Sequence, residues 1–299
     1  MRTRSRNTLV AALLCGVLGI PAASVSAACP AVEPFGPGLF STTSQWEWRI
    51  TFSPLRQQAF WTVSDDFFPV TRQSTIVQSR RSLLGWQAAT TASFSGTYTD
   101  IDPFIAPDGL TLYFSSIRPV DGVARTDLDL WMVKRTSWDS WGEPVHLGLA
   151  NSPGDELYPS IDLWGNLYFG SDRDGQFDIY RSQRRHDGTF GPAQRIGDGV
   201  NTAAYWEFNP EISPDGRTLL FTSLYRPDGY GYGDLYVSHV RNGQFTPARN
   251  LGACVNTAGD EYHPTVLWLE RKLVFVRNPV LPGTNGDFMI TPLRLPPAQ

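Results

Sequence analysis

A sequence unit of about fifty residues recurs along the chain, and it limits the fold more than any other feature. Each copy has an acidic residue followed three positions later by Pro (Ile50 in the first copy), then a turn, an apolar run and a further strand-length run that mostly begins with Asp. The clearest copy runs from Tyr205 to Val237, YWEFNPEISPDGRTLLFTSLYRPDGYGYGDLYV. Its Pro-Asp-Gly turn joins two runs of strand length, which indicates a hairpin.

The spacing of the copies predicts the architecture. Successive Pro positions, with Ile50 in the first copy, are 53, 56, 51 and 54 residues apart. Each copy contains runs for three strands, and four copies are followed by a fourth run such as FTPARNLG. Four strands per unit at this period are typical of a β-propeller. The predicted fold class is therefore all-β, a single β-propeller of four-stranded blades, with five blades, or six as the alternative.

The last copy lacks a fourth run, and a replacement lies at the other end of the chain. PFGPGLFSTTS, from Pro34, resembles FGPAQRIGDGVNT, from Phe190. We predict that residues 35–40 form the outer strand of the last blade by pairing with the strand at Asp287. Cys254 lies in the linker that enters this blade, so a disulfide with Cys29 would fix the closure. Two free or buried thiols are the alternative.

The first 28 residues are predicted to be a signal peptide. Arginines precede an apolar run that is too short to span a bilayer, and small residues follow at a cleavage site: Arg2, Arg4, Arg6, then 9–20, then Ser26-Ala27-Ala28. We expect a periplasmic or secreted protein with no transmembrane segment after processing. A lipoprotein anchored through Cys29 is the less favoured alternative, because Ser26 stands where lipidation signals prefer a bulky aliphatic residue. Residues 29–292 then form the propeller, and 293–299 form a Pro-rich tail.

Charge argues against one class of partner. The whole chain has a net charge of −4, and loss of the leader removes three arginines and no acidic residue, which leaves about −7. An acidic surface disfavours nucleic acids and anionic membranes. No G-x-S-x-G, H-E-x-x-H or paired-Cys zinc motif occurs in the sequence. We expect a monomer that binds an envelope protein or a glycan.

The repeat resembles a known family. The order P-x-I-S-P-D-G, L-Y-F-x-S, x-R and D-I-Y, clearest at 103–131, 159–180 and 210–236, is similar to the WD-like propeller repeats of the TolB type found in bacterial envelope proteins. The resemblance covers essentially the whole mature chain. It implies a propeller fold and an envelope location, and it implies no catalytic residues.

Charged residues recur at fixed positions of the repeat. An acidic residue begins the first strand in all five copies, and we predict that these carboxylates surround one mouth of the channel: Glu47, Asp100, Glu156, Glu207 and Glu261. Arginines follow the second strand and aspartates open the third: Arg118, Arg173, Arg226, Asp129, Asp178 and Asp234. The favoured interpretation is structural, with each acid paired to an arginine or to backbone amides.

The first and last copies depart from this pattern. The first has Asp65 and Asp66 in place of the arginine, and the last has Val280 there. Together with Glu47 and Glu261, these carboxylates would lack a cation and would either raise one another's pKa or recruit Ca²⁺. His263 adds a further candidate ligand-binding group. We therefore predict that any ligand site lies between the first and last blades.

Three functions remain open at this stage. The favoured one is an exported binding or scaffold module for an envelope partner or glycan at the channel mouth. Aromatic loops such as 225–232, with three tyrosines, suit carbohydrate or peptide binding. A carbohydrate-active enzyme that uses two channel carboxylates as acid and base is the first alternative. A purely structural envelope component is the second.

Overall fold

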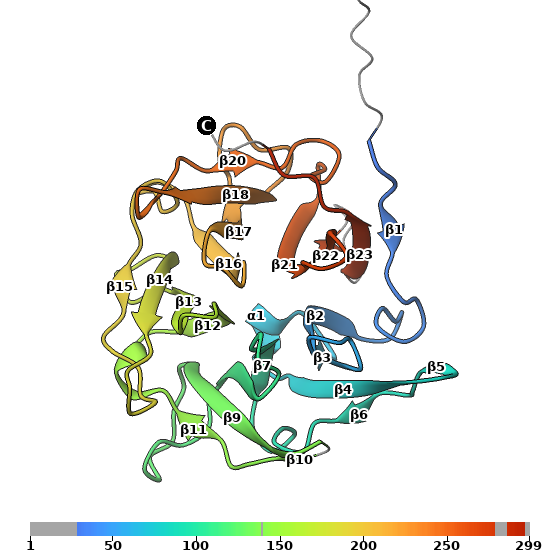
Figure 1. Cartoon of the computed structure of the whole chain (residues 1–299), viewed down its shortest axis with the longest axis vertical. Coiled ribbons are helices and arrows are strands. Elements are labelled where there is room, and N and C mark those ends of the chain that lie inside the picture. The colour runs from blue at the N-terminus through green and yellow to red at the C-terminus, as the bar shows by residue number, and fades with distance from the viewer. Residues whose placement is uncertain (1–28, 139, 279–285, 297–299) are drawn as a thin grey trace, which may run out of the picture.

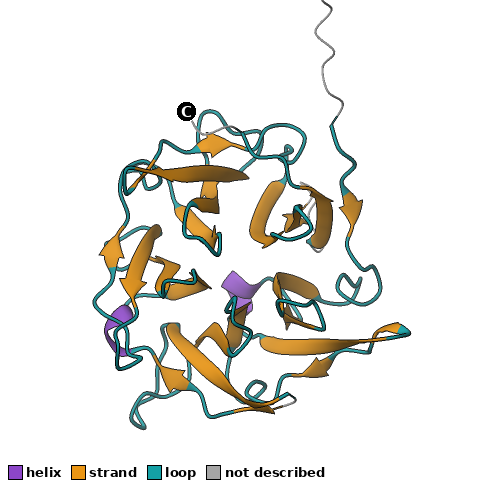
Figure 2. Cartoon of the chain, viewed as in Figure 1, coloured by secondary structure: helices purple, strands orange, loops and turns teal. Residues whose placement is uncertain are grey.

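The protein is a five-bladed β-propeller (Figure 1). The structure is a computed structural model, and it describes residues 29–138, 140–278 and 286–296. Within these ranges almost all regular structure is β-strand, as Figure 2 shows. None of the described helices is long and apolar enough to cross a bilayer. The prediction of five four-stranded blades is confirmed.

The strands follow the repeat from the centre of the ring outward. Blade one comprises β2 (Trp46–Phe52), β3 (Gln58–Ser64), β4 (Thr75–Ser82), β5 (Gly85–Trp86) and β6 (Thr90–Thr91). Blade two comprises β7 (Asp100–Ile105), β8 (Thr111–Ser116), β9 (Asp129–Ser137), β10 (Ser140–Trp141) and β11 (Val145–His146). Blade three comprises β12 (Glu156–Ile161), β13 (Asn166–Ser171), β14 (Asp178–Gln183) and β15 (Gln194–Arg195).

The last two blades complete the ring. Blade four comprises β16 (Glu207–Ile212), β17 (Thr218–Leu224), β18 (Gly233–Arg241), β19 (Gln244–Phe245) and β20 (Arg249–Asn250). Blade five comprises β21 (Asp260–Leu267), β22 (Lys272–Asn278), β23 (Asp287–Pro292) and β1 (Glu33–Pro34). In the part of the chain that the structure describes, two short helices interrupt the pattern, α1 (Phe68–Thr71) and the 3₁₀ helix η1 (Gly148–Ala150).

The N-terminus closes the ring, although its strand begins earlier than predicted. In β1, Glu33 pairs with Ile290 and Pro34 with Met289, antiparallel to β23. Residues 36–40 instead form turns in which Phe40 donates to the carbonyl of Gly36. Prolines at 34 and 37 have no N–H to donate, which limits the ladder to this short stretch. The predicted disulfide between Cys29 and Cys254 is present, with the two Cα atoms 5.2 Å apart.

Apolar faces of neighbouring blades form the core. One cluster joins blade two to blade three through Phe104, Leu130, Leu167 and Phe169, all of them buried. Similar clusters join the other blades because strands with two buried faces are apolar on both sides, as in TLYFSS of β8. Polar residues in the innermost strands are therefore exceptions to this apolar pattern, and their positions indicate the candidate functional site.

Candidate functional site

The five acids that begin the innermost strands form one ring at one end of the channel, here called the clamp ring: Glu47, Asp100, Glu156, Glu207 and Glu261. All five are buried. Arginines at the end of the second strand pair with four of them, and the pairs are Arg118 with Asp100 (2.7 Å), Arg173 with Glu156 (2.9 Å), Arg226 with Glu207 (2.7 Å) and Arg277 with Glu261 (2.8 Å). The structural interpretation is therefore supported for these four blades.

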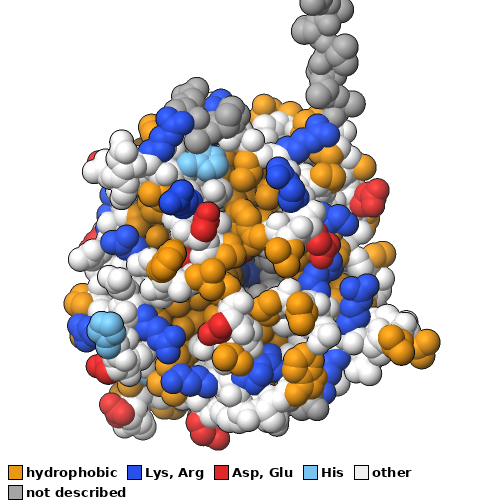
Figure 3. All heavy atoms as spheres, viewed as in Figure 1, with side chains coloured by type: hydrophobic (Ala, Val, Ile, Leu, Met, Phe, Trp, Pro, Cys, Tyr) orange, Lys and Arg blue, Asp and Glu red, His pale blue; other side chains and the backbone are white. Residues whose placement is uncertain are grey.

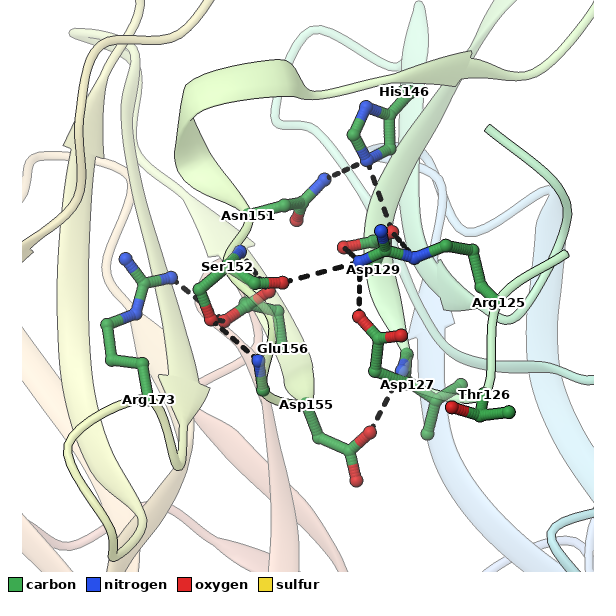
Figure 4. Close-up of polar contacts among 12 residues, drawn as sticks. Arg125, Thr126, Asp127, Asp129, His146, Asn151, Ser152, Asp155, Glu156 and Arg173 are labelled. Carbon is green, nitrogen blue, oxygen red and sulfur yellow. Dashed lines mark hydrogen bonds and ion pairs between the residues drawn. The ribbon is translucent and has the colours of Figure 1, made fainter. Parts of the chain in front are cut away.

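Glu156 shows how a clamp acid joins two blades (Figure 4). Its carboxylate accepts hydrogen bonds from the backbone N–H and the hydroxyl of Ser152, which lies in the linker from blade two. Ser171 and Arg173 donate to it from its own blade, and Arg173 also donates to the carbonyl of Ala150 in the linker. Burial raises the pKa of Glu156 while these donors favour the charged form. The hydrogen-bonding capacity of such an acid is thus used by contacts within the protein.

The predicted lack of a cation at Glu261 is wrong. The alignment placed Val280 at the arginine position, and Val280 lies outside the described residues. Arg277, three residues earlier, donates to Glu261 and to the carbonyl of Val255. Arg277 lies within the second strand directly opposite Glu261, at the position that Ser116, Ser171 and Ser223 occupy in blades two, three and four. The cation thus comes from a different position of the repeat, which is why aligning the arginines of the copies missed it.

Glu47 is the exception in the clamp ring. One of its carboxylate oxygens accepts from the backbone N–H and the hydroxyl of Thr42, and the other is buried with no hydrogen-bond partner. Burial raises the pKa of Glu47 from 4.5 to about 7, against the lowering effect of Thr42. Among the described residues no arginine pairs with Glu47, in agreement with the prediction for the first blade.

The aspartates that open the third strands are also engaged inside their blades. Asp129 contacts Arg125 at 3.2 Å and His146 at 3.3 Å, and Arg125 pairs with Asp127 as well (Figure 4). The other two have comparable partners: Asp178 pairs with Arg195, and Asp234 accepts from Asn250 and from the N–H groups of Tyr230 and Gly231. These residues belong to the framework.

Aromatic and aliphatic side chains close the channel just inside the clamp ring. Trp48, Phe68, Ile101 and Leu157 form one buried cluster, with Tyr262 packed against it. Phe68 begins α1, which Figure 1 places near the centre of the ring. The long connection of blade one, residues 65–74, thus supplies part of this plug. The mouth that the sequence favoured for ligand binding is closed by apolar side chains.

Five polar or aromatic residues meet on the channel axis below the plug, and we call them the axis ring: Arg49, Asp102, Tyr158, Asn209 and His263. Each stands two residues after a clamp acid. Side chains of non-adjacent blades contact one another here, which is possible only across the axis. Asp102 of blade two lies 3.7 Å from His263 of blade five, and the rings of Tyr158 and His263 have centroids 5.4 Å apart.

Arg49 spans the axis from blade one to blade four. Its guanidinium donates to Glu211 at 2.9 Å and to the carbonyl of Pro210 at 3.2 Å, and it lies over the ring of Phe104. Burial raises the pKa of both Asp102 and Glu211 to about 7, although Arg49 opposes the shift. Burial, with Arg49, also lowers the pKa of His263, so this imidazole is neutral.

A funnel opens on the opposite face, where the innermost hairpins turn. It encloses about 570 Å³, and its lining includes Phe52, Phe104, Leu267 and Trp268, with Glu211 among them. Exposed leucines of three hairpins line its rim, Leu55 (77 % exposed), Leu163 (63 %) and Leu269 (90 %). Figure 3 shows a hollow at the centre of the ring with hydrophobic side chains around it. The open end of the channel is therefore mainly apolar, and its charged lining groups are Glu211, Arg81 and the Arg56–Glu270 ion pair.

Asp65 and Asp66 lie apart from the other predicted site residues. They line a second cavity of about 430 Å³ together with hydroxyl-bearing residues that include Thr97, Tyr98 and Thr99 of the linker to blade two. This cavity lies beside blade two, so the structure does not gather these aspartates with Glu261. The three tyrosines of 225–232 are exposed on the β17–β18 loop. Within the described ranges no group of three or more His, Cys, Asp and Glu side chains is arranged to hold a metal ion.

The sequence reasoning missed Arg49 and Glu211. Both are charged residues inside strands otherwise predicted to be buried, WEWRITF and EFNPEI. Glu211 also stands where the other copies have small or apolar residues, Thr51, Phe104, Ser160 and Thr265. Glu211 carries the one charge at its repeat position, and Arg49 is the one cation at a position where another copy has Asp102. These charges at buried positions were the signal that could have identified both residues.

Comparison with known proteins supports the fold. No family model matches the sequence, and no curated protein does. Among solved structures, a protein described as TolB from Agrobacterium tumefaciens is 19% identical over 78% of this chain and 70% of its own, with a TM-score of 0.52. An endo-arabinase from Bacteroides thetaiotaomicron is 14% identical (87% and 96% covered, TM-score 0.55), and a thermostable family-43 glycoside hydrolase is 12% identical (85% and 90%, 0.53). At these identities the likeness shows the fold alone.

Proposed function

We propose that this protein is an exported propeller of the bacterial envelope that binds a ligand in the funnel at the hairpin end of its channel. One observation carries the proposal: the channel is closed by the aromatic plug at the clamp-ring end, whereas the other end is a cavity of about 570 Å³. Cavities of this size with an apolar lining and few polar groups are typical ligand sites.

The exposed leucines at the rim of the funnel also favour binding of a partner. Leu55, Leu163 and Leu269 belong to hairpins of three different blades, yet they surround one opening. Contiguous exposed apolar side chains on a soluble protein commonly mark interaction sites. The disulfide and the TolB-type likeness are consistent with a periplasmic or secreted location. The envelope protein or glycan expected from the sequence would thus be held on this face.

The test uses the mature protein, residues 29–299, with isolated peptidoglycan sacculi and a glycan array as probes. Leu55→Ser with Leu269→Ser should reduce binding at least tenfold. The matched control is Leu83→Ser with Leu84→Ser, because these leucines are equally exposed but lie on the outer hairpin of blade one. Equal loss in both double variants, or no binding by the wild type to either probe, would contradict the proposal and favour a purely structural component.

Hydrolysis of a glycan is the second candidate function, and a specific observation favours it. Asp102 and Glu211 are buried carboxyls beside one arginine, each with a pKa raised to about 7. Groups with a pKa near neutrality can exchange a proton during catalysis. Asp102→Asn and Glu211→Gln should each abolish release of nitrophenol from nitrophenyl glycosides, including the arabinofuranoside. Absence of release by the wild type across such substrates would leave binding as the function.

A further inference from the structure

Arg49 and Asp102 present unpaired hydrogen-bonding groups at the centre of the propeller. Within the described ranges, the Nε and Nη1 of Arg49 and both carboxylate oxygens of Asp102 are buried without a full hydrogen bond, although the backbone of Tyr158 favours the charged form of Asp102. A buried polar group without a partner destabilises the folded state. Folded proteins rarely keep several such groups together, so a molecule that satisfies them is expected at this place.

Local backbone geometry directs these side chains inward. The pairing of each innermost strand with its neighbour shifts register at the axis ring. At four of the five shifts the residue has a positive φ: Asp102 (59°), Tyr158 (62°), Asn209 (51°) and His263 (51°). This conformation is uncommon for residues other than glycine. Asp, Asn and His adopt it most readily, whereas it is unfavourable for a bulky residue such as Tyr158. Bulges of this kind re-aim side chains and are frequent beside functional sites.

The charges at the axis select the ligand. A ligand carboxylate or phosphate would be repelled by Asp102, and an ammonium group would be repelled by Arg49. A hydroxyl group instead accepts from the Arg49 guanidinium and donates to the Asp102 carboxylate, so neighbouring hydroxyls on one ring satisfy both residues. Apolar walls complete the surroundings, since Trp48, Tyr158 and Tyr262 all have ring centroids within 5.9 Å of that of His263. Rings of this kind pack against the C–H faces of sugars.

The funnel ends beside this place, and none of the five axis-ring residues lines it. Glu211 lines the funnel and accepts a hydrogen bond from Arg49, while Phe104 lines the funnel and lies under the same guanidinium, 5.2 Å away. A ligand that reaches the end of the funnel therefore meets Glu211 first and Arg49 directly behind it. The rest of the ligand would remain among the apolar side chains nearer the rim.

We propose that the axis ring and Glu211 form a recognition site for the neutral, hydroxyl-rich ring of a sugar at the end of a glycan. The inference rests on the proposed function, because the funnel is its entrance. Arg49 and Asp102 recognise the hydroxyl groups, and the aromatic residues around His263 recognise the apolar face of the ring.

The experiment measures binding of soluble sugars to the mature protein by isothermal calorimetry and by Trp fluorescence. The probes are arabinose, glucose, galactose, N-acetylglucosamine and short oligomers of each, with glucuronate and glucosamine as charged comparators. At least one neutral sugar should bind in the millimolar range or tighter, and the charged comparator of similar shape should bind at least tenfold more weakly. Preference for a charged comparator would overturn the assignment of the ligand class.

Asp102→Asn is the decisive variant because it keeps the shape of the side chain and removes its charge. It should weaken sugar binding at least tenfold, the effect expected for loss of a charge-assisted hydrogen bond. Glu47→Gln is the matched control, since Glu47 is also buried with a pKa raised to about 7 but lies in the clamp ring. Its sugar affinity should stay within twofold of the wild type, with circular dichroism and melting confirming that both variants fold.

Two outcomes separate this inference from the proposed function. If no sugar binds at 50 mM while sacculi still bind in a manner that depends on Leu55 and Leu269, the funnel is a binding site but the axis groups hold only water, and the inference is wrong. If sugars bind and Asp102→Asn has no effect, the sugar lies elsewhere, and the inference is again wrong. If the rim variants bind sacculi normally, the proposed function itself fails.

Discussion

The clamp ring and the axis ring lie two residues apart on the same five strands, yet one is uniform in residue type and the other is varied. The clamp ring has a carboxylate in every blade, whereas the axis ring has a different residue in each, Arg49, Asp102, Tyr158, Asn209 and His263. A residue type needed by every blade is explained by the construction of a blade. Residue types that differ between equivalent positions have no such common structural role. The contrast therefore separates framework acids from candidate binding groups.

Loss of a clamp acid should have the largest effect on stability. Glu156→Ala leaves Arg173 without its carboxylate and removes the acceptor for Ser152 in the linker. Breaking a buried ion pair on one side costs several kcal/mol, and we expect the free energy of unfolding to fall by about 4 kcal/mol. Urea denaturation measures the change. Glu143→Ala, an exposed acid, is the control. A loss below about 1 kcal/mol would mean that the clamp ring is not a framework.

Opening the disulfide should have the next largest effect. Cys29 and Cys254 are 225 residues apart in sequence, and their bond holds the N-terminal segment that closes blade five. Removal of a disulfide typically costs about 2 to 4 kcal/mol. Cys29→Ser with Cys254→Ser should lower the free energy of unfolding by about 3 kcal/mol, and reduction of the wild type should lower its Tm similarly. An unchanged Tm would show that the ring closes without the bond.

The repeat made the fold predictable, but it could not predict the axis. Pro-Asp-Gly turns and the period of the copies are local signals, so blade number and closure followed from them. The closing strand was placed two residues late because Phe35, Gly36 and Pro37 resemble an outer strand in sequence, whereas residues 36–40 form turns. Arg49 and Glu211 are 162 residues apart in sequence, and their contact depends on ring closure. A local sequence pattern does not predict a contact between residues so far apart in the chain.

Glu47 tests whether the acid of blade one differs from its equivalents. Its folded pKa is raised from 4.5 to about 7, so between these values the folded protein keeps a proton that the unfolded chain has lost. The protonated Glu47 side chain therefore contributes its full stabilisation below about pH 4.5, and this stabilisation is lost as the pH rises to about 7. Glu47→Gln should increase the free energy of unfolding by about 1 to 2 kcal/mol at pH 8 and have little effect at pH 4.

The comparison for Glu47 is Glu156→Gln, measured by urea denaturation at the same two pH values. Glu156 is paired with Arg173, so removal of its charge should destabilise the protein at pH 8. Destabilisation of similar size in both variants would show that Glu47 has a cationic partner and would remove the distinction between blade one and the other blades.

The smallest effect is expected at Asp65 and Asp66. Both are exposed, and their side-chain contacts are weak or local: Gln45 donates to Asp65 at 3.5 Å, and the N–H of Phe67 donates to Asp66. Asp65→Asn with Asp66→Asn should therefore change the free energy of unfolding by less than about 0.5 kcal/mol. Of the carboxylates predicted to recruit Ca²⁺, Asp65 and Asp66 still lie side by side. Any rise in Tm caused by Ca²⁺ in the wild type should therefore be absent from this variant, and it should be retained in the control Asp108→Asn. Destabilisation as large as that of Glu156→Ala would show that Asp65 and Asp66 have a structural role like that of the clamp ring. The distinction between framework and binding carboxylates would then not hold for blade one.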